Sequence, residues 1–141
     1  MDDHRKALAD LYERAGYLPT YRSWAQSLTA LFWWYDTARE PGHQILHNGT
    51  MTFADTGDRA LAITACHVLD QYLEDKASAS KFGCQVGSAE AEPERYLVDC
   101  DDKLDLAVFE FPRTLVAGFG ATVHQSTRWP PAPLHEGDLV E

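Results

Sequence analysis

The sequence predicts a mainly β protein with a helical segment in front of it. Two patterns lead to this prediction. Up to about residue 40, apolar residues recur at steps of three and four, which is typical of helices. After Pro41-Gly42, short apolar runs alternate with turn residues, as the strands of an antiparallel barrel or sandwich require. We therefore expect a helical segment at 1–40 and a β domain at 41–141.

The N-terminal segment divides into two parts. Residues 1–16 have the periodicity of a helix, with Asp2 or Asp3 available to cap its start and Gly16 to end it. At 19–39 a helical stripe overlaps the run Leu31 to Tyr35, which also has strong strand propensity. We expect a second helix there, with passage into a strand left open, and aromatic side chains packed in a core.

The β domain begins with a predicted hairpin. Runs at 49–54 and 59–65 flank the turn sequence Asp55-Thr56-Gly57-Asp58. Further strands are expected at 82–86, 96–100, 104–111 and 114–123, followed by a proline-rich connector at 127–133. Alternation in 104–111 places Asp105 among apolar side chains, so we expect a hydrogen-bond donor for its carboxylate.

Charge limits the classes of partner. The 141 residues include 12 Lys and Arg against 22 Asp and Glu, which gives a net charge of −10. Nucleic acids and anionic membranes would repel such a chain, so we expect neither as a partner. The first residues lack the charged and apolar regions of a secretion signal, and no run of about 18 apolar residues occurs. A cytoplasmic location is therefore expected.

Cysteine and histidine spacing predicts neither a disulfide framework nor a metal site. Cys66, Cys84 and Cys100 are odd in number and widely spaced, which favours reduced, buried thiols. His43 and His47 lie four residues apart, but glycine and proline breakers bracket them, and no C-x-x-C or H-E-x-x-H motif occurs. We expect surface histidines, no metal and no cofactor.

Two short motifs carry candidate chemistry. In the first, Thr64-Ala65-Cys66-His67, a predicted strand delivers a histidine into a turn or short helix; in the second, Asp105-Leu106-Ala107, an aspartate lies in an apolar strand. On an extended strand Cys66 and His67 would point to opposite faces, which argues against a Cys-His dyad. The plain structural interpretation is a hydrogen-bonded histidine at a strand end and a carboxylate that caps a turn.

These motifs, in this order and after the hairpin, resemble the trypsin-like peptidases of the chymotrypsin fold. The first barrel of that family carries a general base in Thr-Ala-x-His and an orienting acid in Asp-[Leu/Ile]-Ala, and Gly137-Asp138-Leu139-Val140 also matches the family's order. The resemblance covers about residues 41–141. It implies a six-stranded antiparallel barrel, with His67 as general base and Asp105 as orienter, acting on a peptide or protein substrate.

The departure from the family is equally informative. The Gly-[Asp/Asn]-Ser-Gly motif of the nucleophile is missing. The resemblance therefore implies the N-terminal half of a serine peptidase, with a second barrel, later in the chain or on another polypeptide, supplying the serine, the oxyanion hole and the specificity pocket. We expect no activity from these 141 residues alone. The alternative is an inactive peptidase-like barrel that serves as a binding or regulatory module.

Overall fold

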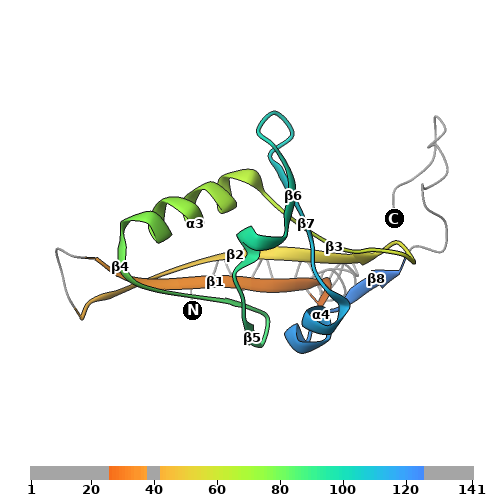
Figure 1. Cartoon of the computed structure of the whole chain (residues 1–141), viewed down its shortest axis with the longest axis horizontal. Helices are drawn as coiled ribbons and strands as arrows, with labels where there is room; N and C mark the ends of the chain where they lie inside the picture. The colour runs from red at the N-terminus through yellow and green to blue at the C-terminus, as the bar shows by residue number, and fades with distance from the viewer. Residues whose placement is uncertain (1–25, 38–41, 126–141) are drawn as a thin grey trace, which may run out of the picture.

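The protein folds around one large antiparallel sheet. The computed structural model describes residues 26–37 and 42–125, and the predicted helix at 1–16, the connector at 127–133 and the motif at 137–140 lie outside these ranges. The strands are β1 (Leu28–Thr37), β2 (Gln44–Asp55), β3 (Ala60–Thr64), β4 (Ala79–Val86), β5 (Ala89–Glu90), β6 (Leu97–Asp101), β7 (Leu106–Glu110) and β8 (Val123–Gln125). Helix α3 (Cys66–Ser78) lies along one face of the sheet (Figure 1).

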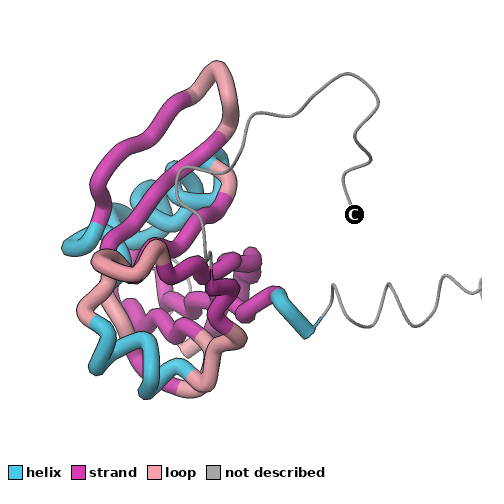
Figure 2. Tube along the Cα trace, turned by 90° about the vertical axis from the view of Figure 1, so that its right-hand side faces the viewer, coloured by secondary structure: helices cyan, strands magenta, loops and turns pink. Residues whose placement is uncertain are grey.

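The strands follow the order β5-β4-β1-β2-β3-β7-β6, and β8 pairs with β2 in the only parallel contact among these strands. The mainly β, antiparallel prediction is thus confirmed. The two end strands, β5 and β6, do not pair with one another, so within the described ranges the sheet is open rather than closed into a barrel. In Figures 1 and 2 the β6–β7 hairpin extends from the sheet beside the start of α3.

The ambiguous run at 31–35 forms the central strand β1. Leu31, Trp33 and Tyr35 are buried, and every second residue faces the core, which is the strand period of two rather than the helical period. Because β1 pairs with both β2 and β4, pairing on two sides outweighs the helical stripe. Within the segment expected at 19–39, residues 26–27 are helical and Leu28–Thr37 is strand, so the passage into a strand does occur, while 19–25 lies outside the described residues. The aromatic residue Trp33 does pack in the core.

The predicted hairpin is confirmed as β2 and β3. The Thr56 amide donates to the Arg59 carbonyl at 3.0 Å, and Gly57 adopts a φ of +99°, which glycine tolerates without steric cost. Asp55 accepts a hydrogen bond from the Gly57 amide at 2.8 Å and pairs with Arg113. The strands expected at 82–86, 96–100 and 104–111 correspond to β4, β6 and β7.

The strand expected at 114–123 is wrong for most of its length. Residues Arg113–Phe119 form helix α4, and only the last residues reach β8. Pro112 begins the helix, and Gly120 ends it with a φ of +66°. Val116 and Phe119, three residues apart, are buried on one helical face. Residues Pro93–Tyr96 form the short 3₁₀ turn η1, and no helix in the described ranges is long and apolar enough to cross a membrane.

Candidate functional site

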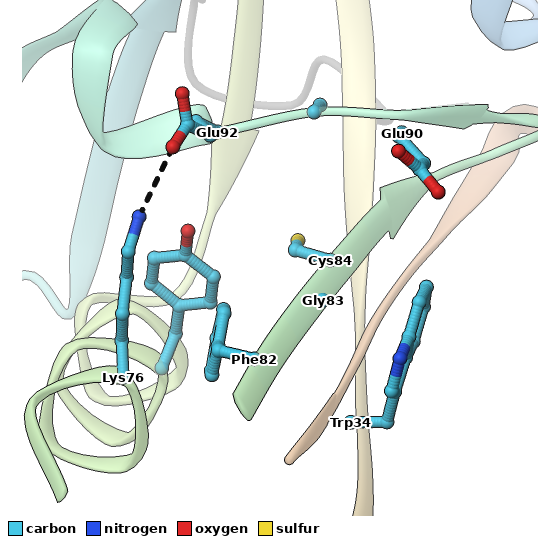
Figure 3. Close-up of a pocket in the computed structure, with 9 residues that line it drawn as sticks. Trp34, Lys76, Phe82, Gly83, Cys84, Glu90 and Glu92 are labelled. Atoms are coloured by element: carbon cyan, nitrogen blue, oxygen red, sulfur yellow. Dashed lines mark hydrogen bonds and ion pairs between the residues drawn. The ribbon is translucent and has the colours of Figure 1, made fainter. Parts of the chain in front are cut away.

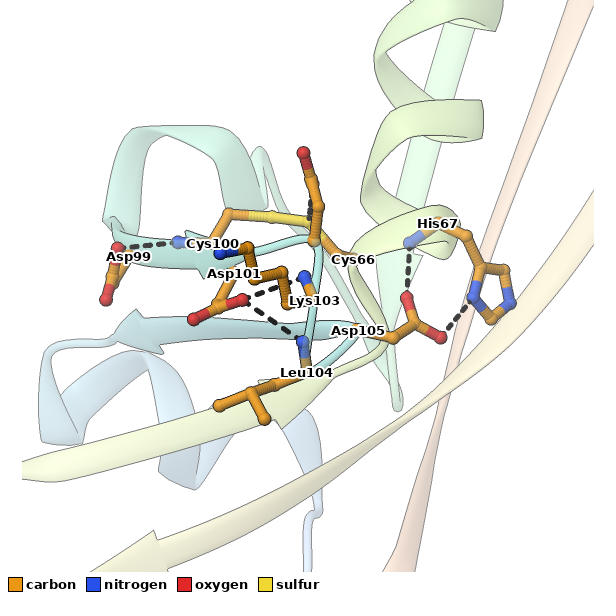
Figure 4. The surroundings of a disulfide bond; sticks show 9 residues. Cys66, His67, Asp99, Cys100, Asp101, Lys103, Leu104 and Asp105 are labelled. Carbon is orange, nitrogen blue, oxygen red and sulfur yellow. Dashed lines mark hydrogen bonds and ion pairs between the residues drawn. A yellow bond between two sulfur atoms is a disulfide. The ribbon is translucent and has the colours of Figure 1, made fainter.

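The structure brings His67 and Asp105 into contact. His67 is the second residue of α3, directly after β3, while Asp105 lies in the turn that leads into β7. The carboxylate uses both oxygens: Oδ2 lies 2.7 Å from Nδ1 of His67, and Oδ1 accepts the His67 backbone N–H at 3.0 Å (Figure 4). The expected pairing of the aspartate with an imidazole nitrogen is therefore confirmed.

The surroundings of Asp105 differ from the prediction. It precedes β7 instead of lying within it, has a φ of +52°, and its side chain is 48% exposed. The preceding turn is tightened by Asp101, whose Oδ1 accepts the backbone N–H groups of Lys103 and Leu104. Aspartate is among the residues that tolerate this left-handed conformation. The hydrogen-bond donors predicted for the Asp105 carboxylate are present. The prediction assumed a buried carboxylate, however, and this one is exposed.

Asp105 also caps helix α3. The N-cap residue Ala65 has no side chain that can accept a hydrogen bond, and Asp105 supplies a carboxylate at that helix end from a distant part of the chain. The pKa of Asp105 is lowered, first by the His67 backbone N–H and then by the His67 side chain. The cap fixes the His67 backbone, so one carboxylate sets both the position and the ring orientation of this histidine.

The pairing determines which imidazole nitrogen is free. An ionised carboxylate only accepts hydrogen bonds, so the neutral ring facing Asp105 carries its hydrogen on Nδ1. The Nε2 lone pair then faces outward, and the His67 side chain is 73% exposed. A ring held in this state can accept a proton at Nε2 and form an imidazolium next to the carboxylate.

His67 stands between two surface hollows. One, of about 390 Å³, includes Thr52 and Ile63 in its lining; the other, of about 440 Å³, includes Leu46 and His47. His67 and its neighbour Val68 line both. No serine lines either hollow among the residues that the structure describes. A nucleophilic serine at Nε2 would therefore have to come from a partner or from another part of the protein.

The prediction of three reduced cysteines is wrong for two of them. Cys66 and Cys100 form a disulfide, with their Cα atoms 6.0 Å apart, while Cys84 is free and buried. Burial raises the pKa of the Cys84 thiol to about 12. The disulfide excludes a Cys66–His67 dyad. The sequence argument against this dyad assumed that both residues lie on a strand, and this assumption is wrong because both lie on α3.

A second histidine–carboxylate pair was missed by the sequence interpretation. His47 Nδ1 lies 2.8 Å from Asp75, whose carboxylate also accepts hydrogen bonds from Trp33 Nε1 at 2.8 Å and Gln71 Nε2 at 3.0 Å. Asp75 is only 5% exposed. Burial alone would raise its pKa, but the hydrogen bonds from Trp33, Tyr35 and Gln71, together with His47, lower it.

A sequence signal for this pair did exist. Cys66, Leu69, Tyr72 and Asp75 recur at steps of three along α3 and form its buried face. A carboxylate that continues such a stripe must find donors in the core. His47 is thus tied to the core by its ring rather than being a simple surface histidine. In the described part of the chain, neither His43 nor His47 belongs to a group of three potential metal ligands.

A third hollow, of about 600 Å³, lies away from His67 and includes Trp34 and Cys84 in its lining (Figure 3). The ammonium group of Lys76 lines this hollow and is already paired within the protein. Its Nζ lies 3.5 Å from Glu92, also pairs with Glu94, and lies 5.9 Å from the centre of the Tyr72 ring. Because the charges are paired internally, we assign this region to the packing of α3 against β4.

Comparisons with known proteins return no match to the chain, whether with protein-family models, with curated proteins or with solved structures.

Proposed function

We propose that this chain carries the general base and the orienting acid of a serine peptidase. The observation that supports the proposal is the two-oxygen pairing of Asp105 with His67, which leaves Nε2 exposed between two hollows. The six-stranded barrel of the chymotrypsin fold belongs to the same proposal. It is supported by the β2–β3 hairpin and by the chain order of the His67 and Asp105 motifs, whereas the described strands form one open sheet, so closure into a barrel is the part of the proposal that needs further structure.

The proposed reaction is acyl transfer from a peptide bond. Nε2 of His67 takes the proton of a serine hydroxyl as that oxygen attacks the carbonyl carbon. Asp105 stabilises the imidazolium that forms, and His67 then donates the proton to the leaving amine. Water repeats the sequence to release the acid product.

The nucleophile belongs to a second barrel in this proposal. Ser78, Ser80 and Ser88 donate their hydroxyls to backbone carbonyls, so none of these three hydroxyls is directed to His67. The second barrel, following residue 141 or on another polypeptide, provides the serine, the oxyanion hole and the specificity pocket.

A binding-module function is the second candidate, and one surface favours it. On the face of the sheet opposite the core, exposed apolar side chains occur on four neighbouring strands: Leu28, Leu46, Ile63 and Leu106. Leu46 alone is 66% exposed. Such a surface is typical of a face that packs against another body. This apolar face could be covered by a second barrel or by a regulatory partner. A test of the chemistry at His67 is therefore needed to distinguish the peptidase function from the binding function.

The location is also a proposal. The sequence favours the cytoplasm, whereas a disulfide between Cys66 and Cys100 favours an oxidising compartment. Fractionation of the source cells, with the thiols blocked at lysis, measures both the compartment and the redox state of this pair.

Labelling with a fluorophosphonate probe tests the peptidase proposal. The protein is isolated from its source with the polypeptide that continues or accompanies this chain, and labelling of a serine is recorded. We expect His67→Gln to abolish labelling and His124→Gln, an exposed histidine on β8, to leave it unchanged. Labelling that persists in His67→Gln excludes this histidine as the base. If the wild-type protein takes up no probe, the binding-module function replaces the peptidase function.

A further inference from the structure

Three potential metal ligands meet at the disulfide, outside the chemistry proposed for His67. The Sγ atoms of Cys66 and Cys100 and a carboxylate oxygen of Asp102 all lie within 4.8 Å of one another. Cys66 begins α3 and Cys100 lies on β6 (Figure 4). Asp102 follows β6 in the turn. Asp102 Oδ1 is already 3.2 Å from Cys66 Sγ.

The oxidised pair cannot bind a metal through thiolates, because each sulfur is bonded to the other. Reduction changes this. A dithiol reductant passes two electrons and two protons to the disulfide, becomes a cyclic disulfide itself, and leaves Cys66 and Cys100 as thiols. Two thiols and a carboxylate are then in one place, and the start of helix α3 stabilises negative charge at Cys66.

We propose that the reduced chain binds one zinc ion through Cys66, Cys100 and Asp102, with water as the fourth ligand. Binding replaces the two thiol protons, which are released to solvent. Zinc is the metal that this donor set favours, because thiolates select soft and borderline ions over Ca²⁺ and Mg²⁺.

The positions of the three side chains fit a zinc ion. Tetrahedral zinc with Zn–S bonds of about 2.3 Å needs the two sulfurs about 3.8 Å apart and each sulfur about 3.6 Å from the carboxylate oxygen. Asp102 is close to that separation from Cys66. The sulfurs must move apart after reduction, which a rotation about the side-chain bonds of Cys100 allows because this residue is only partly buried.

The consequence concerns His67 and Asp105. The disulfide joins the start of α3, which carries His67, to β6, and the turn that carries Asp105 follows directly after β6. Zinc between the same cysteines would join the same two elements. The pairing would then be kept in an oxidising compartment by the disulfide and in a reducing one by the metal.

Zinc titration of the chain tests the proposal without reference to peptidase activity. The purified chain is reduced with a phosphine, freed of reductant without air, and titrated with Zn²⁺ in competition with a chromophoric chelator. We expect one zinc per reduced chain and none in the oxidised chain. Cobalt, used in place of zinc, should give the strong near-ultraviolet absorption of thiolate ligands in the reduced chain only.

Variants identify the ligands. Asp102 is exposed, so Asp102→Asn should fold normally and weaken zinc binding at least tenfold. Glu74 is an exposed carboxylate on α3, the helix that begins with Cys66, so Glu74→Gln should leave the zinc affinity unchanged. Cys66→Ser should abolish zinc binding. The proposal is overturned if the reduced chain binds no zinc, if the oxidised chain binds it equally well, or if Asp102→Asn behaves as Glu74→Gln does.

Discussion

Asp105 holds His67 at two points, the backbone N–H through Oδ1 and the ring Nδ1 through Oδ2. A carboxylate that only capped the helix would need the first contact alone. The second contact sets the ring tautomer and leaves Nε2 free on the surface. Because the two residues are 38 positions apart, this arrangement depends on the long-range packing of α3 against the turn before β7.

The tautomer of His67 should depend on the charge of residue 105. In Asp105→Asn the amide oxygen can keep the helix cap while the NH₂ group faces Nδ1, so the ring hydrogen should move from Nδ1 to Nε2. Long-range proton–nitrogen NMR distinguishes the two forms. Asp102→Asn, in the same turn, should keep the Nδ1–H form. An Asp105→Asn protein with an unchanged tautomer would contradict this assignment.

The three cysteines should differ in reactivity. In the oxidised native protein we expect no thiol to react with Ellman's reagent, because Cys84 is buried and its pKa is raised to about 12. Unfolding without a reductant should expose one thiol, and unfolding after reduction should expose three. Three thiols on unfolding without a reductant would show that the disulfide is absent.

Asp75 should matter for stability far more than an exposed aspartate on the same helix. Asp75→Ala leaves the buried Nε1–H donor of Trp33 without its acceptor and also removes the hydrogen bond from Gln71, so the free energy of unfolding should fall by about 2–4 kcal/mol. Asp70→Asn, at an exposed position of α3, should change it by less than about 0.5 kcal/mol. Urea denaturation followed by circular dichroism measures both. Equal effects would mean that the network around Asp75 does not stabilise the fold.

Acid should destabilise the protein. Several carboxyl groups have pKa values below their ordinary range because they accept hydrogen bonds or face cations: Asp55, Asp58, Asp75, Glu94, Asp105 and Glu110. Their unfolded-state pKa values are higher, so the unfolded chain binds protons first as the pH falls. Between pH 7 and pH 3, stability should therefore be constant down to about pH 5 and fall progressively below it. Melting temperatures between pH 7 and pH 3 test this, and a melting temperature that rises below pH 4 would contradict it.

The sequence predicted features that depend on local pattern. The β2–β3 hairpin follows from a glycine turn between two apolar runs, and the motif around His67 places this residue just after a strand. Asp105 was predicted within its strand and instead precedes β7. The prediction failed where tertiary contacts decide. Strand β1 carries a helical stripe that pairing on two sides overrides, and α4 was missed although Pro112 and Gly120 mark its ends.

The same distinction applies to the polar groups. The partner of Cys66 lies 34 residues away on β6, and cysteine spacing alone does not reveal which strand will lie beside the start of α3. Asp75 could have been noticed on the buried stripe of its helix, but its donors come from β1 and β2 as well as from Gln71. Their identity depends on how the helix lies across the sheet.

The labelling rate of the native protein is the most direct test of the proposed role of the pair. Rates of reaction with a fluorophosphonate at neutral pH are compared for the wild-type protein, Asp105→Asn and Asp70→Asn. We predict that Asp105→Asn slows labelling by about 10²–10⁴-fold, because the base loses its correct tautomer, whereas Asp70→Asn, at an exposed position of α3, labels at the wild-type rate. Equal rates for all three proteins would contradict the proposal that Asp105 orients His67 for catalysis.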